Sequence, residues 1–130
     1  MNKRDRVGVL VIKDHKLLLV NGYGLAQYWT PGGGIEEGEN HEQALKREML
    51  EELGVEIDDL RFYMEMQYVN EVSGREETNN YYFVEVKGEM VPSQEITQYG
   101  FFGTEEFARM PHFAGEAAVM ARLLADGLIL

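Results

Sequence analysis

A single helix with both ends marked in the sequence, preceded by a glycine-rich stretch, governs how the rest of the chain can fold. Asn40 followed three residues later by Gln43 is a capping box, the pattern of a helix start. Apolar residues then recur every four positions from Leu45 to Leu53, and Gly54 offers the left-handed residue that ends a helix. These signals predict a helix over residues 41–53 with one apolar face, which needs a surface to pack on.

Strand-forming runs on both sides of this helix supply that surface. Residues 6–12 and 16–20 are apolar and rich in β-branched side chains, and Asp14-His15 separates them, which predicts a buried hairpin. Residues 60–68 alternate apolar and polar, the period of a half-buried strand, and 81–86 follow as another strand. The remaining expectations are loops at 21–38, 70–80 and 92–98, a short strand at 100–103, and helices at 105–109 and 114–125. Interleaved strands and helices predict a mixed α/β class with helices packed on a sheet.

Length and composition narrow the function. The chain of 130 residues is expected to form one domain over residues 1–130. Its 12 basic and 23 acidic residues give a net charge of −11, which repels a phosphate backbone and argues against bulk nucleic acid as a partner. The apolar run Val7–Ile12 is too short for a signal peptide or a membrane span, and cysteine is absent, which excludes disulfides and thiol catalysis. We therefore expect a cytoplasmic protein without a membrane partner.

Three carboxylates share one face of the predicted helix. Glu48, Glu51 and Glu52 stand at i, i+3 and i+4, within an arc of about 100°. Like charges at these spacings repel, and hard divalent cations prefer oxygen ligands, so the three glutamates suit a metal ion that bridges to phosphates. The alternative is a simple solvated acidic face, which is common on helices.

The spacing around these glutamates is more specific than their charge. From Gly33 to Val55 the sequence reads Gly33, five residues, Glu39, seven residues, Arg47-Glu48-Met49, one residue, Glu51-Glu52, one residue, and Gly54-Val55. This stretch resembles the Nudix box at every fixed position of the family pattern. The preceding residues 28–33, Tyr-Trp-Thr-Pro-Gly-Gly, are similar to the family's usual lead-in, although Thr30 replaces a commoner aliphatic residue.

The resemblance implies a fold and a reaction. The fold is the Nudix-type α/β/α sandwich, a mixed β-sheet flanked by helices. The reaction of MutT-like nucleoside diphosphate-X pyrophosphohydrolases is attack of water on phosphorus with Mg²⁺ or Mn²⁺ bound. Carried onto this sequence, the metal ligands would be Glu48, Glu51, Glu52 and the Gly32 carbonyl, and either Glu48 or Glu51 would double as the general base.

Arg47 stands about 40° around the helix from Glu51, so its guanidinium can orient that carboxylate while Glu39 takes the other edge. An ordinary surface ion pair is the alternative. Outside the box, Glu95, Glu36 and Glu37 are weaker site candidates. The three histidines, His15, His41 and His112, show no metal-ligand spacing, and the aromatic runs at 81–83 and 101–102 are expected to build core rather than stack a base.

Three functional classes compete at this point. The first is a metal-dependent diphosphohydrolase of a small nucleotide or nucleotide conjugate. The second is a non-catalytic module that binds or senses a nucleotide, which the complete set of box glutamates disfavours, and the third is an acidic interaction domain. Among substrates, nucleoside triphosphates, including oxidised ones, are slightly favoured, because no proline lies between Pro31 and Pro92 where ADP-ribose cleaving members carry one. Whether the protein forms a homodimer stays open.

Overall fold

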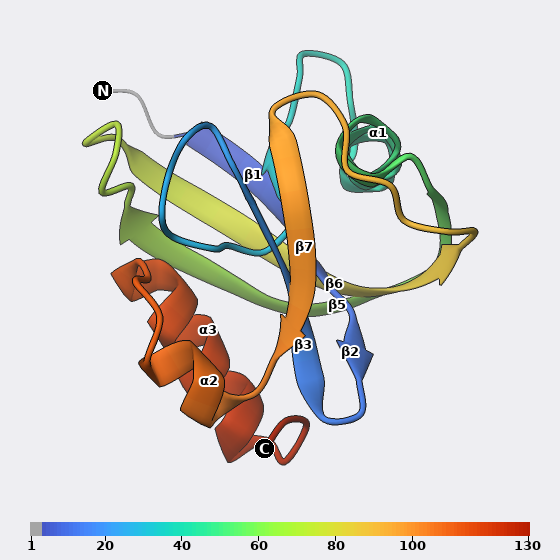
Figure 1. Cartoon of the computed structure of the whole chain (residues 1–130). Helices are drawn as coiled ribbons and strands as arrows, with labels where there is room; N and C mark the ends of the chain where they lie inside the picture. Colours follow the sequence, from blue (N-terminus) through green and yellow to red (C-terminus); the bar gives the residue numbers. More distant parts are fainter. Residues whose placement is uncertain (1–3) are drawn as a thin grey trace.

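The computed structural model describes residues 4–130, over which two β-sheets lie between one helix on one side and two helices on the other (Figure 1). One sheet has the order β4-β1-β6-β5 and the other the order β2-β3-β7. The elements are β1 (Arg4–Leu10), β2 (Ile12–Lys13), β3 (Lys16–Gly22), β4 (Gly32–Gly34), α1 (His41–Leu53), β5 (Glu56–Val69), β6 (Glu76–Lys87), β7 (Ile96–Phe102), α2 (Thr104–Ala108) and α3 (Ala114–Ala125).

The four-stranded sheet is mixed. β1 runs parallel to β6 and antiparallel to β4, and β5 and β6 form a long antiparallel hairpin. Helix α1 packs on one face of β1 and β3 and on β5, whereas α2 and α3 pack on the opposite face of β1 and β3 and on β6. The predicted α/β class with a mixed sheet flanked by helices is confirmed.

Helix α1 has the predicted boundaries. The Asn40 side chain accepts the Gln43 N–H at 2.8 Å and the Gln43 side chain accepts the Asn40 N–H at 2.9 Å, which completes the capping box. Gly54 ends the helix with φ 66°, a left-handed conformation that glycine adopts without strain. Both signals are local in sequence, which is why they could be recognised without tertiary information.

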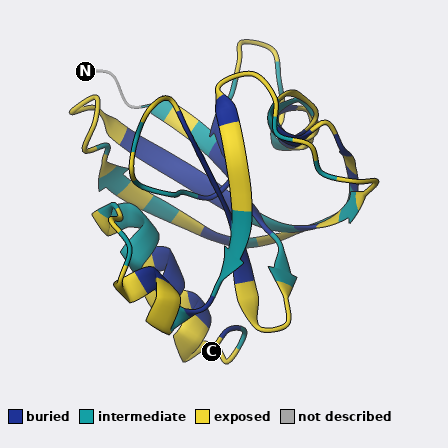
Figure 2. Cartoon of the chain, in the orientation of Figure 1, coloured by how far each residue is buried: buried dark blue, intermediate teal, exposed yellow. Residues whose placement is uncertain are grey.

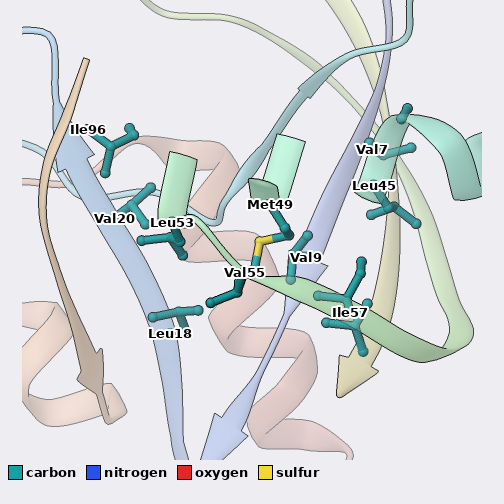
Figure 3. Packing of buried hydrophobic residues seen from close by; sticks show 12 residues of the cluster. Val7, Val9, Leu18, Val20, Leu45, Met49, Leu53, Val55, Ile57 and Ile96 are labelled. Carbon is teal, nitrogen blue, oxygen red and sulfur yellow. The ribbon is translucent and has the colours of Figure 1, made fainter. Parts of the chain in front are cut away.

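The apolar face of α1 lies in the larger core. Met49 is fully buried, and its thioether points between Val9, Val55 and Leu53 (Figure 3). The same cluster contains residues from both sheets, so α1 is fixed against the two sheets at once. This packing fixes the position and rotation of α1, and so determines where its opposite, acidic face contacts strand β4.

We expect Met49→Ala to lower the free energy of unfolding by roughly 2 to 5 kcal/mol, because it leaves a cavity in a fully buried site. Urea denaturation followed by circular dichroism measures the change. Leu50→Ala is the matched control on the next residue, whose side chain is 59% exposed and should cost little. Equal losses from the two variants would contradict the assignment of the buried face.

The predicted hairpin of residues 6–12 and 16–20 was wrong in its pairing. The turn at Asp14 and His15 is present, with φ 52° and 62°, but only the two residues of β2 pair with β3. Before the turn the chain leaves the first sheet at Val11, so that β1 pairs with β4 and β6 instead. Alternation of apolar residues does not distinguish a strand that continues in one sheet from a strand that crosses to another.

The expected loops were also too long at two places. β6 begins at Glu76, inside the predicted loop 70–80, and its first residues Glu77–Asn80 are buried although all are polar. β7 begins at Ile96, inside the predicted loop 92–98, because backbone pairing with β3 holds Thr97 and Gln98 in the strand. In both cases tertiary pairing overrides the polar composition.

Helix α3 has the expected bounds, yet a different face is buried. In the sequence, Ala117, Ala118, Ala121, Leu124 and Leu128 form an apolar stripe that predicts a core or dimer contact rather than a cofactor site. The buried residues are instead Val119, Met120 and Leu123, which remove more apolar surface from water than alanine does. Figure 2 shows the exposed residues along the outer side of this helix. Among residues 4–130, no helix is both long and apolar enough to cross a bilayer.

Candidate active site

The acidic face of α1 meets the glycine strand β4. A Cβ atom on Gly33 would lie 2.5 Å from the Glu48 carboxylate oxygen Oε1, so any side chain at this position would displace that carboxylate. Gly32 has φ 137°, a conformation that only glycine adopts readily. The glycine run is therefore required by close approach of the backbone to Glu48 and by its own conformation.

The pairing of β4 with β1 directs backbone groups toward α1. Val9 donates to the Pro31 carbonyl at 2.8 Å, and this hydrogen-bonded pair is the neighbour of the Gly8 and Gly32 pair. Hydrogen-bonded and free pairs alternate in an antiparallel ladder, so the backbone groups of Gly32 point away from β1. Accordingly, the Gly32 N–H donates to Oε1 of Glu52 at 3.4 Å. The neighbouring Gly32 carbonyl is free of β1 and available as an oxygen donor.

Arg47 joins the loop and the helix. Its Nε and Nη2 donate to the two oxygens of Glu39 at 2.6 and 2.9 Å, a bidentate pair, and Nη2 also donates to the Gly34 carbonyl at 3.0 Å. Its Nη1 donates to Glu48 at 2.9 Å and to Glu51 at 3.3 Å. The contacts expected of Arg47 with Glu39 and Glu51 are both present, and Glu48 adds a further one.

The Arg47 network changes the ionisation of its partners. The hydrogen bond from Arg47 lowers the pKa of Glu39 from 4.5 to about 2, and donating to the Glu39 carboxylate raises the pKa of Arg47 above its already high value. Both groups therefore keep their charges at any pH where the protein would be assayed. Arg47 stays a fixed cation between the loop and the helix.

Glu48 and Glu52 are the two carboxylates that approach each other. The Glu48 side chain is only 13% exposed, whereas that of Glu51 is 45% exposed and turned toward Arg47. Burial and the adjacent Glu48 carboxylate raise the pKa of Glu52, since two like charges in a poorly hydrated place repel. A cation placed between these carboxylates would relieve that repulsion.

The donor set fits a hard divalent ion only in part. Across residues 4–130, no three acidic or histidine side chains converge closely enough to form a ready metal cage. The Glu48 and Glu52 carboxylates and the Gly32 carbonyl face one place, and all are oxygen donors of the kind that Mg²⁺ and Mn²⁺ prefer. Glu51 joins this set only if its carboxylate leaves Arg47.

A pocket of about 490 Å³ opens beside these carboxylates. Part of its lining is formed by Glu48, Glu52, Gly32 and Gly33. The rest of the lining combines aromatic and apolar groups with charged ones, among them Tyr23, Trp29, Phe113, Arg4, Arg6, Glu71 and Glu116. Tyr23 and Trp29 lie with ring centroids 6.1 Å apart. The pocket thus combines two aromatic rings, tilted by 39° to each other, with the carboxylates of α1.

Glu116 projects into the pocket from the first turn of α3. Both the backbone N–H and the hydroxyl of Thr30 approach its Oε2, at 3.5 and 3.2 Å. Desolvation raises the pKa of Glu116 to about 7 against these opposing hydrogen bonds. The group therefore changes charge near neutral pH inside the pocket.

We expect Glu116→Gln to raise the melting temperature by roughly several degrees at pH 8 and by much less near pH 5. Between pH 4.5 and about 7 the folded state binds more protons at Glu116 than the unfolded state, so stability falls as pH rises over that interval and then levels off. Glutamine removes this loss. Scanning calorimetry from pH 4.5 to 8.5 measures the difference in melting temperature between variant and wild type, with the exposed Glu105→Gln as control. A difference that does not change with pH would contradict the prediction.

The weaker candidates lie apart from the pocket lining. Glu36, Glu37 and Glu95 are exposed, and Glu36 approaches Arg47 only at 3.7 Å. His41 bonds the Tyr82 hydroxyl at 2.8 Å and His112 bonds the Met110 carbonyl at 2.8 Å. The histidines therefore have structural partners or, for His15, a place in the β2–β3 turn.

Several lining residues escaped the sequence reasoning. Arg4 and Arg6 occupy alternate positions before the apolar run of β1, and Asn79 lies in the stretch taken for a loop. Glu116 stood on a helix whose faces had been assigned differently. The one available signal was the i, i+2 spacing of the two arginines at the start of a predicted strand.

Comparison with known sequences agrees with this arrangement. The NUDIX domain profile matches residues 2–123. An RNA pyrophosphohydrolase of Photobacterium profundum is 39% identical over 59 residues, which cover 45% of this chain and 34% of that protein. One from Aliivibrio fischeri is 37% identical over 59 residues, covering 45% of this chain and 35% of that protein. The match thus spans only about a third of the length of these curated relatives.

Solved structures show the same fold along nearly the whole chain. The MutT NUDIX hydrolase of Burkholderia pseudomallei superposes with a TM-score of 0.83 at 19% identity, covering 95% of this chain and 99% of that one. The E. coli ORF135 protein superposes with a TM-score of 0.78 at 26% identity, covering 96% and 91%. With the family profile matched over almost its entire length, the chain belongs to the NUDIX family.

Proposed function

We propose that this protein is a Mg²⁺- or Mn²⁺-dependent pyrophosphohydrolase that cleaves a nucleoside triphosphate, oxidised ones included, to the monophosphate and pyrophosphate. The observation that carries the proposal is the complete set of Nudix box glutamates, of which Glu48 and Glu52 contact the glycine strand and line a pocket of about 490 Å³. A sensing module would have no need for every one of these carboxylates.

In this proposal the residues divide the work. Glu48, Glu52 and the Gly32 carbonyl would hold the metal, and Glu51 would join them once its carboxylate leaves Arg47. When bound there, the metal would supply charge neutralisation for the phosphates and would make water a better nucleophile. Arg47 would fix the direction of the Glu48 carboxylate, and either Glu48 or Glu51 would remove a proton from the attacking water. The histidines have no role in this proposed reaction.

The pocket supports a mononucleotide substrate. Tyr23 and Trp29 offer aromatic faces for a base, and the volume of about 490 Å³ is within the range of small-ligand sites. The names of the curated relatives favour a second candidate, the 5′ end of an RNA. We place it behind free nucleotides because a chain with net charge −11 repels a polynucleotide backbone.

A substrate panel tests the proposal. The purified protein is incubated with Mg²⁺ or Mn²⁺ and with nucleoside triphosphates, 8-oxo forms, nucleotide conjugates and a 5′-triphosphorylated RNA, and products are identified by mass spectrometry. Release of pyrophosphate from free nucleotides supports it. Faster cleavage of the RNA would select the second candidate, and binding without cleavage of any substrate would select a sensing module.

We expect millimolar Mg²⁺ or Mn²⁺ to raise the melting temperature more than NaCl of equal ionic strength. When the free ion concentration is about 100 times the dissociation constant, binding stabilises the folded state by about 2.7 kcal/mol. Differential scanning fluorimetry measures the shift, and Glu52→Gln should reduce it. A shift that NaCl reproduces would exclude a specific metal site.

A further inference from the structure

The last turn of α1 carries two of the three box glutamates. Glu51 and Glu52 stand just before Leu53, the final residue of the helix. The C-terminal end of a helix is negative and disfavours carboxylates, and this turn contains no basic residue. Helix ends also fray. The turn that holds Glu51 and Glu52 beside Glu48 is therefore the part of α1 that most needs support from outside the helix.

All four terminal carbonyl groups of α1 have hydrogen-bond donors. An α-helix leaves its last four carbonyls without donors inside the helix. In α1 the Leu50 carbonyl accepts the N–H of Gly54 at 3.1 Å. The Leu53 carbonyl accepts the N–H of Val91 at 2.9 Å, although Val91 lies in the connection between β6 and β7. The remaining two carbonyls bond to one residue of this same connection.

Ser93 supplies the donors for both of these carbonyls. Its N–H donates to the Glu52 carbonyl at 2.9 Å, and its hydroxyl donates to the Glu51 carbonyl. In Figure 1 the connection from β6 passes next to α1 before it enters β7. We call residues 91–95 the strap. Ser93 is the strap residue that contacts the main chain of the two glutamates in the last turn.

The strap contains a defined turn. The N–H of Ile96 donates to the Ser93 carbonyl at 3.2 Å, and Gln94 between them has φ 59°. A left-handed conformation is unfavourable for a residue other than glycine, and it persists where surrounding contacts fix it. Here the contacts of Ser93 with α1 lie before the turn, and the pairing of β7 with β3 follows it. The strap therefore holds Ser93 in one orientation toward α1.

The far end of the strap reaches another part of the pocket. The Glu95 carbonyl accepts the N–H of Tyr23 at 3.1 Å. A Cβ atom on Gly22 would overlap the same carbonyl oxygen, so glycine is required for this close approach. Tyr23 and Glu52 both line the pocket. The strap thus joins α1 to the loop that carries Tyr23 through main-chain hydrogen bonds.

We propose that the strap positions the metal-binding turn of α1, with Ser93 as the positioning residue. This inference rests on the proposed function, which supplies the metal. Glu48, Glu51 and Glu52 share one side of α1 only while its last turn is helical, and the donors of Ser93 stabilise that helical turn. An ion binds more weakly to a site whose competent conformation is only partly populated. Strap docking and metal binding therefore strengthen each other.

Mn²⁺ affinity tests the proposal without turnover. Electron paramagnetic resonance of free Mn²⁺ gives the dissociation constants of the wild type and of Ser93→Ala. We expect Ser93→Ala to bind Mn²⁺ roughly tenfold more weakly, as when groups that orient metal ligands are lost. Ser93→Thr, which keeps the hydroxyl, should restore most of the affinity. The matched control is Thr97→Val, because the Thr97 hydroxyl also donates to a backbone carbonyl, that of Asn21 on β3 at 3.4 Å.

The melting temperature separates positioning from a general loss of stability. In EDTA, Ser93→Ala should melt close to the wild type, because one hydrogen bond at an exposed residue is a small part of the total stability. A purely structural role would instead lower this melting temperature and leave Mn²⁺ affinity unchanged.

A measurement on the wild-type protein keeps the test decisive if the variants are unstable. If the docked strap strengthens metal binding, bound metal must stabilise the docked strap by the same factor. We therefore expect Mg²⁺ to slow hydrogen exchange at the Val91 and Ser93 amides by roughly tenfold, as measured by NMR. The control is the Gly74 amide, which donates to the Asn70 carbonyl at 2.8 Å in the turn between β5 and β6 and should exchange at the same rate with and without Mg²⁺.

The outcomes separate the two proposals. A Ser93→Ala variant that binds Mn²⁺ as tightly as the wild type or more tightly, or strap amides whose exchange Mg²⁺ leaves unchanged, would overturn the positioning role. Ser93-dependent Mn²⁺ binding in a protein that hydrolyses no nucleotide would leave this role standing and reject the hydrolase. Hydrolysis with Mn²⁺ binding independent of Ser93 would reject the positioning role alone, and a wild-type protein that binds no Mn²⁺ would reject both.

Discussion

Glu52→Gln is expected to reduce kcat by roughly 10³-fold, because loss of one metal ligand removes several kcal/mol of stabilisation from the charged transition state. The fold should survive. The carboxylate of Glu52 is already disfavoured by burial and by Glu48, and glutamine can donate to Glu48 without adding a second charge. Steady-state assays at saturating Mg²⁺, combined with thermal melting, measure both effects.

Glu42→Gln is the matched control for this experiment. Glu42 stands on the same helix but is exposed and pairs only with Lys46 at 2.8 Å. It should retain nearly full activity, since exposed helix pairs contribute little. A Glu52→Gln enzyme as active as the Glu42→Gln control would reject Glu52 as a metal ligand.

Arg47→Lys is expected to lower kcat by roughly 10- to 100-fold with a small change in melting temperature, the range observed when groups that orient metal ligands are lost. Lysine keeps the charge but has a single nitrogen, so it cannot pair with Glu39 in a bidentate manner while also holding Glu48 and Glu51. The assay is kcat at saturating metal and substrate. Arg109→Lys, from an exposed pair with Glu105, is the control.

A double-mutant cycle with Glu39→Gln isolates the orienting role. If Arg47 and Glu39 act as one unit, the loss in the double variant should be smaller than the sum of the two single losses on a free-energy scale. Additive losses would show that Arg47 works independently of the loop. If Arg47→Lys kept the wild-type kcat, Arg47 would have no orienting role and would act only as a surface cation.

The sequence was informative where the signals are local. Both ends of α1 depend on residues within one turn of the boundary, and the contacts of Arg47 with Glu51 and Glu39 depend on helix geometry and the loop that leads into it. These features could be predicted because each involves residues near one another along the chain.

The pocket depended on contacts between distant segments. Glu77 and Asn79 are polar and were assigned to a loop, but pairing of β6 with β1 places them in a sheet and against two arginines. Similarly, the sheet change at Val11 reflects the competition of β4 and β6 for the edges of β1. No periodicity within one segment records which partner a strand will choose.

The parallel pairing of β1 with β6 also bears on how the chain assembles during synthesis. Arg4 pairs with Glu77, 73 positions later, and Leu17 of β3 pairs with Phe102, 85 positions later. Such distant contacts form late, because the entropy of closing a long loop must be overcome first. Helix α1 can therefore coil as it leaves the ribosome and β4 can pair with one edge of β1 early, but the other edge of β1 has no partner until β6 has been translated. Over that interval the apolar residues of β1 and β3 remain exposed, which makes the nascent chain a candidate for chaperone binding.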